Sequence, residues 1–301
     1  MKSLLHQLAF GIWAMRPEAV SAYMPQVQEI MFGNTLVSST DAPAPAPVVT
    51  VPKLEFMTLE GERLALDPTK PIRSEEGLVA VVSIEGPIMR NDFCGDAGML
   101  TMARWYADLE NTPEIIGIVE DVNSPGGNGH AMLALTTQKE RMKKPVVSLV
   151  RHGMACSAAQ GIVAPSDLVF STTDLDEFGS IGTYVKLVDW DAAMAKRHDL
   201  KVHTIKATRS TQKNADVERA LSADPADPKD NYDGLRKNYI DPFNEAFIQL
   251  IQRNRPGVKD ENGVLEGRVY VAKDAMKYGL IDSTGETLES AIAAVRQLAT
   301  Q

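Results

Sequence analysis

From about residue 77 onward, short runs of β-branched residues alternate with stretches whose apolar positions recur at helical spacing. Such runs predict strands, and the spaced stretches predict helices. The predicted strands are 78–84, 115–122, 145–150, 168–171 and 201–206. The predicted helices are 99–109, 130–141, 156–163, 231–253 and 286–298. This alternation predicts an α/β layered fold, and the near-continuous apolar strands indicate a mostly parallel sheet that is buried on both faces.

The first 50 residues follow a different pattern. Apolar residues from Leu4 to Trp13 lie at helical spacing, so we expect helix within residues 4–33. Alternating alanine and proline over residues 42–47 exclude a helix and favour an extended linker. We therefore divide the chain into an N-terminal appendage with its linker (1–50), a main domain (51–285) and a C-terminal helix (286–301). The polar residues 209–230 are expected to form a loop or lid.

Composition argues against several classes of function. The net charge of -9 does not fit a general nucleic-acid binder, which would carry a basic face. The two cysteines, Cys94 and Cys156, are too few for a disulfide framework, and the five histidines lack metal-site spacing. We expect no metal and no cofactor. No segment has the length and apolar character of a membrane span, so a cytoplasmic protein without a membrane anchor is expected.

Two adjacent glycines, Gly126 and Gly127, follow the predicted strand 115–122 within a Ser-Pro-Gly-Gly segment. Glycine leaves neighbouring backbone N–H groups unshielded and permits positive φ. A helix predicted just afterwards adds its dipole to these donors, which makes the segment a candidate oxyanion site. On this motif alone, an ordinary strand-to-helix turn is the more common explanation.

Ser157 is a candidate nucleophile near the start of the predicted helix 156–163. Its small neighbours leave room for a substrate carbonyl, and a helix N-terminus stabilises nearby negative charge. On spacing alone, a helix N-cap is the more common explanation. Cys156 and Cys94 are most simply small buried residues. The Gly-Ser-Ile-Gly segment at 179–182 predicts either a second loop with accessible backbone groups or a simple turn.

A serine nucleophile needs a base that removes its proton. His152 lies five residues before Ser157, but no aspartate is clearly placed to orient it. A lysine serves when burial lowers its pKa enough to make it neutral at the working pH. Lys206 ends the predicted strand 201–206, and Lys213 lies in the loop after it. Lysines at such positions are usually solvated surface residues.

Four segments, in this order, resemble the protease IV or signal peptide peptidase A family. They are Ser-Pro-Gly-Gly at 124–127, Lys-Pro-Val-Val at 144–147, the small residues around the serine at 155–159, and Gly-Ser-Ile-Gly at 179–182. Residues 267–282 are similar to the family's C-terminal portion. The resemblance covers residues 77–285, and it implies a ClpP/crotonase-like fold and a serine peptidase with a Ser/Lys dyad.

The resemblance also assigns roles to residues. Ser157 matches the nucleophile, and the N–H groups of Gly126, Gly127 and Ala158 would form the oxyanion hole. The family's base lies a few residues past a strand that ends in Ile-Lys, which here is 205–206. Counting onward reaches Thr211, and Lys213 lies two residues later, so we infer a short insertion. Lys213 is the predicted base, and Lys206 is the second candidate.

The chain departs from the family at the nucleophile, where the usual Ser-Gly-Gly-Tyr is Ser-Ala-Ala-Gln at 157–160. The appendage and linker are more similar to soluble phage head-maturation proteases than to membrane-bound members. This implies a polypeptide substrate, with phage capsid or scaffold proteins as the specific hypothesis, in a bacterial or phage-infected cell. Relatives form rings or domes, in some of which two subunits share an active site, so a homo-oligomer is expected.

Two alternatives remain open. One is a crotonase-like acyl-CoA enzyme, which would use the same oxyanion hole without Ser157 or a lysine. The other is a catalytically degenerate peptidase fold that acts as a scaffold or assembly protein, and the altered segment 157–160 keeps this alternative open.

Overall fold

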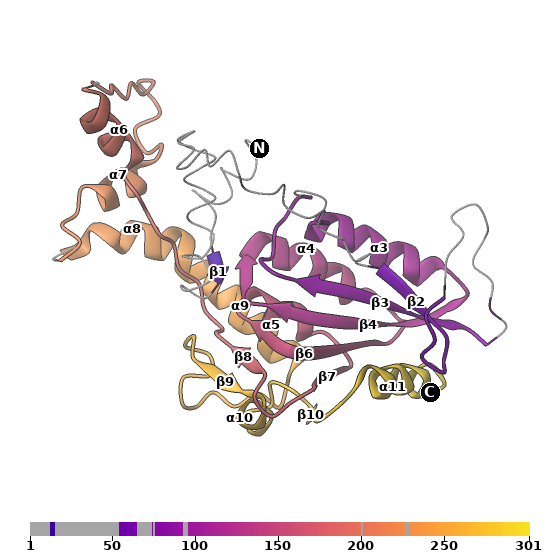
Figure 1. The fold of residues 1–301 in the computed structure, drawn as a ribbon. Helices are drawn as coiled ribbons and strands as arrows, with labels where there is room; N and C mark the ends of the chain where they lie inside the picture. Colours follow the sequence, from indigo (N-terminus) through magenta and orange to yellow (C-terminus); the bar gives the residue numbers. More distant parts are fainter. Residues whose placement is uncertain are drawn as a thin grey trace, which may run out of the picture.

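The computed structural model describes residues 13–15, 54–64, 74, 76–92, 96–199, 201–226 and 229–301. In this part of the chain the centre is an eight-stranded sheet with the main order β10-β7-β6-β4-β3-β2 (Figure 1). Its strands are β2 (Leu54–Met57), β3 (Leu78–Glu85), β4 (Ile115–Ser124), β6 (Val146–Cys156), β7 (Leu168–Ser171), β8 (Glu177–Gly179), β9 (Val269–Val271) and β10 (Ser283–Thr284).

Most strand pairs in this sheet are parallel. Strands β3, β4, β6 and β7 pair in parallel, and β2 lies antiparallel to β3 at one edge. The end of β6 also pairs in parallel with β8, which in turn pairs antiparallel with β9. The predicted strands 78–84, 115–122, 145–150 and 168–171 are therefore confirmed, and β6 extends six residues beyond its predicted end.

Helices cover both faces of the sheet. The helices are α3 (Met99–Asn111), α4 (Gly129–Lys139), α5 (Ala158–Val163), α6 (Trp190–His198), α7 (Ala215–Leu221), α8 (Asp233–Leu235), α9 (Asp241–Asn254), α10 (Ala272–Lys277) and α11 (Leu288–Ala299). Helices α3, α4, α5 and α9 contribute to one buried cluster, and α11 packs on the other face through Ile292 and Val295. This arrangement confirms the predicted α/β class with a mostly parallel sheet.

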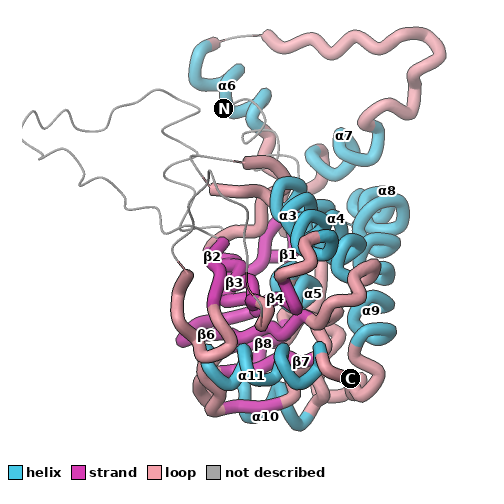
Figure 2. The backbone as a smooth tube through the Cα atoms, turned by 90° about the vertical axis from the view of Figure 1, so that its right-hand side faces the viewer, coloured by secondary structure: helices cyan, strands magenta, loops and turns pink. Residues whose placement is uncertain are grey.

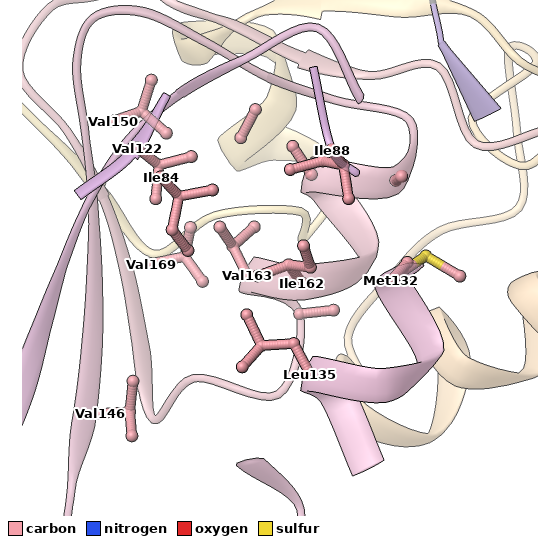
Figure 3. Close-up of a cluster of buried hydrophobic side chains, with 14 of the residues drawn as sticks. Ile84, Ile88, Val122, Met132, Leu135, Val146, Val150, Ile162, Val163 and Val169 are labelled. Carbon is pink, nitrogen blue, oxygen red and sulfur yellow. The ribbon is translucent and has the colours of Figure 1, made fainter. Parts of the chain in front are cut away.

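The larger hydrophobic cluster lies between the sheet and the helices α4 and α5 (Figure 3). Leu135 of α4 and Ile162 of α5 are fully buried, as are Val122 and Val150 on the strands. Burying one such side chain contributes roughly 1.5–3 kcal/mol relative to exposure. This packing fixes α5, and therefore its first turn, against the carboxyl ends of β4 and β6.

A buried ion pair crosses this apolar layer. Lys139 Nζ donates to Glu120 Oε2 at 2.8 Å, to the Ile162 carbonyl at 2.7 Å and to Ser166 Oγ at 2.8 Å. Tyr106 Oη donates to the other Glu120 oxygen at 2.6 Å. Burial lowers the pKa of the Lys139 ammonium below its ordinary value, and Glu120 opposes this shift. The cluster ties α3, α4 and the segment after α5 to β4.

Residues 184–240, called the arm below, stand away from the sheet in both views (Figures 1 and 2). The arm contains α6, α7 and α8, and a π-helical turn at Arg236–Ile240 joins it to α9. The two segments that flank the arm are held together, because the Thr183 N–H donates to Asn244 Oδ1 at 2.9 Å. Among the described residues, no helix combines the length and the apolar character needed to cross a membrane.

The arm accounts for most of the wrong element predictions. The predicted strand 201–206 is irregular, and Ile205 is 92% exposed, because no sheet edge lies beside this segment. The predicted loop 209–230 contains α7. The predicted long helix 231–253 is confirmed, since residues 233–254 are helical throughout, with a π-helical turn at Arg236–Ile240. Within the predicted helix 4–33, Trp13–Met15 forms the strand β1 instead, and the rest lies outside the described residues.

Lys139→Ala should destabilise the fold, because Glu120 would remain buried without its main cationic partner. Removing one partner of a buried pair costs about 3–5 kcal/mol, and we expect the free energy of unfolding to fall by that amount. The control Lys143→Ala removes an exposed lysine and should change this free energy by less than about 0.5 kcal/mol. Urea unfolding followed by circular dichroism measures both variants. Equal stability of the two would contradict the role of the pair.

Candidate active site

Ser157 forms the turn between β6, which ends at Cys156, and α5, which begins at Ala158. Its backbone has φ 57° and ψ -120°, a combination that glycine adopts easily and other residues rarely do. The Ser157 N–H donates to the Gly179 carbonyl at 2.7 Å, and the Ser157 carbonyl accepts from the Gly161 N–H at 3.1 Å. Strained conformations of this kind persist only where the surroundings hold them, as these two bonds do here.

The N-cap explanation for Ser157 does not fit this geometry. An N-cap serine has an extended backbone, and its hydroxyl accepts a hydrogen bond from the second or third residue of the helix. Ser157 lies in the positive-φ region and makes no such side-chain bond to α5. Its hydroxyl is therefore not used to cap the helix. The residue is 1% exposed.

The glycine segment lies at the same end of the sheet as Ser157. Strands β4 and β6 are parallel neighbours, and Ser124 of β4 lies opposite Ala155 of β6. After β4 the chain forms the short strand β5 (Gly126–Asn128), and α5 packs against it. The glycines therefore lie in a short strand, and α4 begins at Gly129 directly after it, as the predicted helix after the glycines requires.

The backbone groups of the two glycines have different partners. The Gly126 N–H donates to Ser124 Oγ at 3.2 Å, so it is already engaged. Ile88 bonds to both sides of Gly127, because its N–H donates to the Gly126 carbonyl at 2.9 Å and its carbonyl accepts from the Asn128 N–H at 2.8 Å. Backbone groups alternate between the two edges of an extended strand. The N–H and carbonyl of Gly127 therefore face away from Ile88, toward the opposite edge of β5.

Both glycines are required by the backbone. Gly126 has φ 97°, and a Cβ on Gly127 would lie 2.3 Å from the Ile88 carbonyl oxygen. Ala158, the third predicted donor, is the first residue of α5, so its N–H has no acceptor within the helix. These observations make Gly127 and Ala158 better candidate oxyanion donors than Gly126.

The Gly-Ser-Ile-Gly segment lies on the other side of Ser157. Strand β8 pairs with the end of β6 so that Gly179 lies opposite Cys156. Gln160 Oε1 accepts a hydrogen bond from the Gly179 N–H at 3.0 Å, so Gly179 is held by both Ser157 and Gln160. Ser180, which follows, also has a positive φ of 54°.

Gln160 is a residue that the sequence does not reveal as important. In the sequence it is only a departure from the family pattern, whereas its side chain positions the loop beside Ser157. Gln160 is fully buried, and its amide nitrogen has no hydrogen-bond partner among the residues that the structure describes. No spacing rule connects position 160 to position 179, so only the folded chain shows the contact.

The candidate lysines are not brought to Ser157 within the chain. Lys206 Nζ donates to Glu218 at 2.6 Å, within the arm. Lys213 is exposed and lies two residues before α7, which contacts α8 and the 3-10 turn at Lys229–Tyr232. In both views α7 stands well apart from α5 (Figures 1 and 2).

The other candidate groups are also separated from Ser157 or engaged elsewhere. His152 is exposed and lies in an irregular part of β6, where its φ is 52° and the register with β4 shifts. Asp176 accepts hydrogen bonds from the Gly153 N–H and from Ser171 Oγ, and does not orient a histidine. Cys156 is buried, and Cys94 lies outside the described residues. No group of three or more His, Cys, Asp or Glu side chains in the described ranges is arranged to hold a metal ion.

Comparisons with known proteins indicate one family. The profile of peptidase family S49 matches residues 138–301. A protease of Methanocaldococcus jannaschii is 30% identical over 205 residues, which cover 65% of this chain and 62% of the relative. Protease 4 of Salmonella typhi is 27% identical over 229 residues, which cover 74% of this chain and 35% of the relative. The chain thus spans less than two thirds of the length of either relative.

Among solved structures, the 1510-N membrane-bound stomatin-specific protease is similar with a TM-score of 0.41 and 16% sequence identity. The similarity covers 70% of this chain and 80% of that one. The family match includes Ser157, both candidate lysines and the segment 179–182, but it begins after Gly126 and Gly127. The assignment of these two glycines therefore depends on their geometry beside α5.

Ser157→Gly and Ser157→Ala should differ in stability, because only glycine adopts this backbone conformation without strain. Strain of this kind costs alanine about 1–3 kcal/mol, which glycine avoids. Glycine in turn loses about 0.5–1 kcal/mol more than alanine in backbone entropy on folding, and this offsets part of its advantage. We therefore expect Ser157→Gly to have the larger free energy of unfolding, by about 1 kcal/mol. Denaturant titrations of the two variants measure the difference. A more stable Ser157→Ala would show that the turn is not strained.

Proposed function

Because the chain belongs to peptidase family S49, we propose that it is a serine endopeptidase that hydrolyses peptide bonds with a Ser/Lys dyad. One observation carries this proposal. Ser157 lies in a strained turn, uncommitted to capping, between the backbone segments Gly126–Asn128 and Gly179–Ser180. A nucleophile supported rigidly beside N–H donors is what acyl transfer requires.

In the proposed mechanism a neutral lysine takes the proton of Ser157 as its Oγ attacks the substrate carbonyl. The N–H groups of Gly127 and Ala158 donate to the oxyanion, while Gly126, engaged by Ser124, holds the loop. The C–N bond then breaks, and the lysine gives its proton to the leaving amine. Water hydrolyses the acyl-enzyme by the same route.

We assign the base to Lys213, with Lys206 as the second candidate. Lys206 Nζ is committed to an ion pair with Glu218, whereas the structure shows no comparable side-chain bond for Lys213 in the described part of the chain. Since α7 of the arm stands apart from α5, which Ser157 directly precedes, we propose that the lysine reaches the serine of a neighbouring copy. The complete site would then require two subunits.

Exposed apolar side chains on the arm support assembly. Ile205 is 92% exposed, and Val188, Val202 and Tyr239 are exposed as well. Exposed apolar side chains lose contact with water when a projecting segment packs against another chain. A second copy of the chain that contacts the arm would bury these side chains. The Ser157 of that second copy would then lie near Lys213 of the first. We therefore propose a homo-oligomer.

Two other functions fit this fold, an acyl-CoA enzyme and a non-catalytic scaffold, and each can be distinguished from a peptidase. A crotonase-like acyl-CoA enzyme is disfavoured by the match to a peptidase family. A degenerate scaffold would assemble but would show no effect of Ser157→Ala.

The phage capsid or scaffold substrate stays a prediction. Co-expression with candidate scaffold proteins and mass spectrometry of their termini would test it, and uncut termini would count against it.

Casein hydrolysis should be lost in Ser157→Ala and in Lys213→Ala, because the nucleophile and its base are both required, and Lys206→Ala should retain activity. Retained activity in Lys213→Ala together with loss of activity in Lys206→Ala would contradict the assignment to Lys213.

Mixing the two inactive variants tests whether subunits share a site. Unfolding Ser157→Ala and Lys213→Ala together and refolding them as mixed oligomers should restore about a quarter of wild-type activity, because some sites then pair an intact serine with an intact lysine. The same treatment of each variant alone is the control. No recovery in an assembled mixture would place serine and lysine in one chain.

Ile205→Lys should weaken assembly, since it places a charge in the proposed contact between copies. Leu175→Lys is the matched control, because Leu175 is also well exposed, at 76%, but lies outside the arm. Light scattering at working concentration should show a lower mass for Ile205→Lys and the wild-type mass for the control. A monomeric wild type, or equal masses for the two variants, would contradict the role of the arm.

A further inference from the structure

A segment of the N-terminal appendage pairs with the strand that carries the candidate oxyanion donor. Strand β1 (Trp13–Met15) is antiparallel to β5, and the register places Ala14 opposite Gly127. Trp13 lies opposite Asn128, and Met15 lies opposite Gly126. Figure 1 shows β1 at the end of the sheet from which the arm projects.

Strand β1 lies on the edge of β5 that a peptide substrate would need. Ile88 occupies one edge of β5, so the N–H and carbonyl of Gly127 face the other edge, where Ala14 lies. A substrate carbonyl that accepts from the Gly127 N–H must approach this same edge. Extended peptides bind strand edges through backbone hydrogen bonds, and one edge accepts one partner at a time. Pairing with β1 and pairing with substrate therefore exclude each other.

The site is closed in this arrangement. All three residues of β5 are buried, and Ser157 is 1% exposed. A substrate carbonyl has no route to the Ser157 hydroxyl and to the Gly127 N–H unless something moves. Of the elements around the site, β1 is held to β5 across a pairing of only three residues, whereas α5 and β6 are built into the core.

We propose that Trp13–Met15 is an internal inhibitor that occupies the strand position of the peptide substrate. This inference rests on the proposed peptidase function. Because the segment belongs to the same chain, it competes at a high effective concentration, and substrate binds only to the fraction of molecules in which it is released. Withdrawal of the appendage, by a partner or by cleavage within it, would activate the enzyme.

Ala14→Pro tests this inference, because proline lacks the N–H needed for strand pairing and is disfavoured in a paired strand. The matched control is Ala42→Pro, the same substitution in the Ala-Pro linker. Hydrolysis of a peptide substrate and hydrogen exchange of the backbone amides of β5, followed by mass spectrometry, are measured for both variants and the wild type. We expect Ala14→Pro to raise kcat/KM roughly fivefold or more and to speed exchange of the Gly127 amide. Ala42→Pro should match the wild type in both.

A synthetic peptide of residues 9–20 should inhibit Ala14→Pro competitively, and the same peptide with proline at position 14 should not. Wild-type values of both kcat/KM and exchange in Ala14→Pro would overturn the inference. Faster exchange without a change in kcat/KM would also overturn it, since β1 would then pair with β5 without blocking substrate. Absence of Ser157-dependent hydrolysis from every variant would instead overturn the proposed function, and exchange would still report whether β1 covers β5.

Discussion

The hydrogen bond from the Ser157 N–H to the Gly179 carbonyl holds the candidate nucleophile in a conformation that serine does not adopt by itself. Its supports come from separate parts of the chain. Helix α5 is fixed by the buried cluster with α4, and Gly179 is fixed by β8 and by the Gln160 side chain. The strain at Ser157 is therefore maintained by packing across the whole layer, and the local sequence contributes little to it.

The parallel pairing of β4 and β6 determines what Ser157 faces. Because their carboxyl ends lie at the same edge of the sheet, β5 and α5 follow as neighbours and bring the Gly127 N–H close to the turn. The buried cluster of Glu120 and Lys139 joins β4 to the C-terminal part of α5, because Lys139 Nζ donates both to Glu120 and to the Ile162 carbonyl. The arm begins just beyond the same edge, and in the proposed oligomer it would carry its lysine to the site of another copy.

Much of the central sheet could be predicted because its strands are largely apolar, and because β3 and β4 are followed directly by Gly86 and Pro125. The strands β3, β4 and β7 follow directly from their β-branched runs. The arm could not be predicted, since residues 201–206 have the alternation of a strand but no sheet edge beside them. For β1, helical spacing from Leu4 to Trp13 indicated a helix, whereas pairing with β5 gives Trp13–Met15 an extended backbone.

The candidate site, too, could be predicted only in part from the sequence. Ser157, the glycine pair and the segment 179–182 could be found from motif order, and the structure brings them together. The contact of Gln160 with Gly179 and the engagement of the Gly126 N–H by Ser124 depend on side-chain positions that no pattern encodes. In the proposed dyad the position of the lysine relative to Ser157 would depend on a neighbouring copy, which a single sequence does not describe.

The most direct test of this account is covalent labelling with a small fluorophosphonate, followed by mass spectrometry of the digested protein. An activated serine forms a stable phosphonyl ester, whereas an ordinary serine does not react. The account predicts a single adduct on the peptide containing Ser157, labelled more slowly in Lys213→Ala. An unmodified Ser157 in assembled wild-type protein, or an adduct that forms equally fast without the lysine, would contradict it.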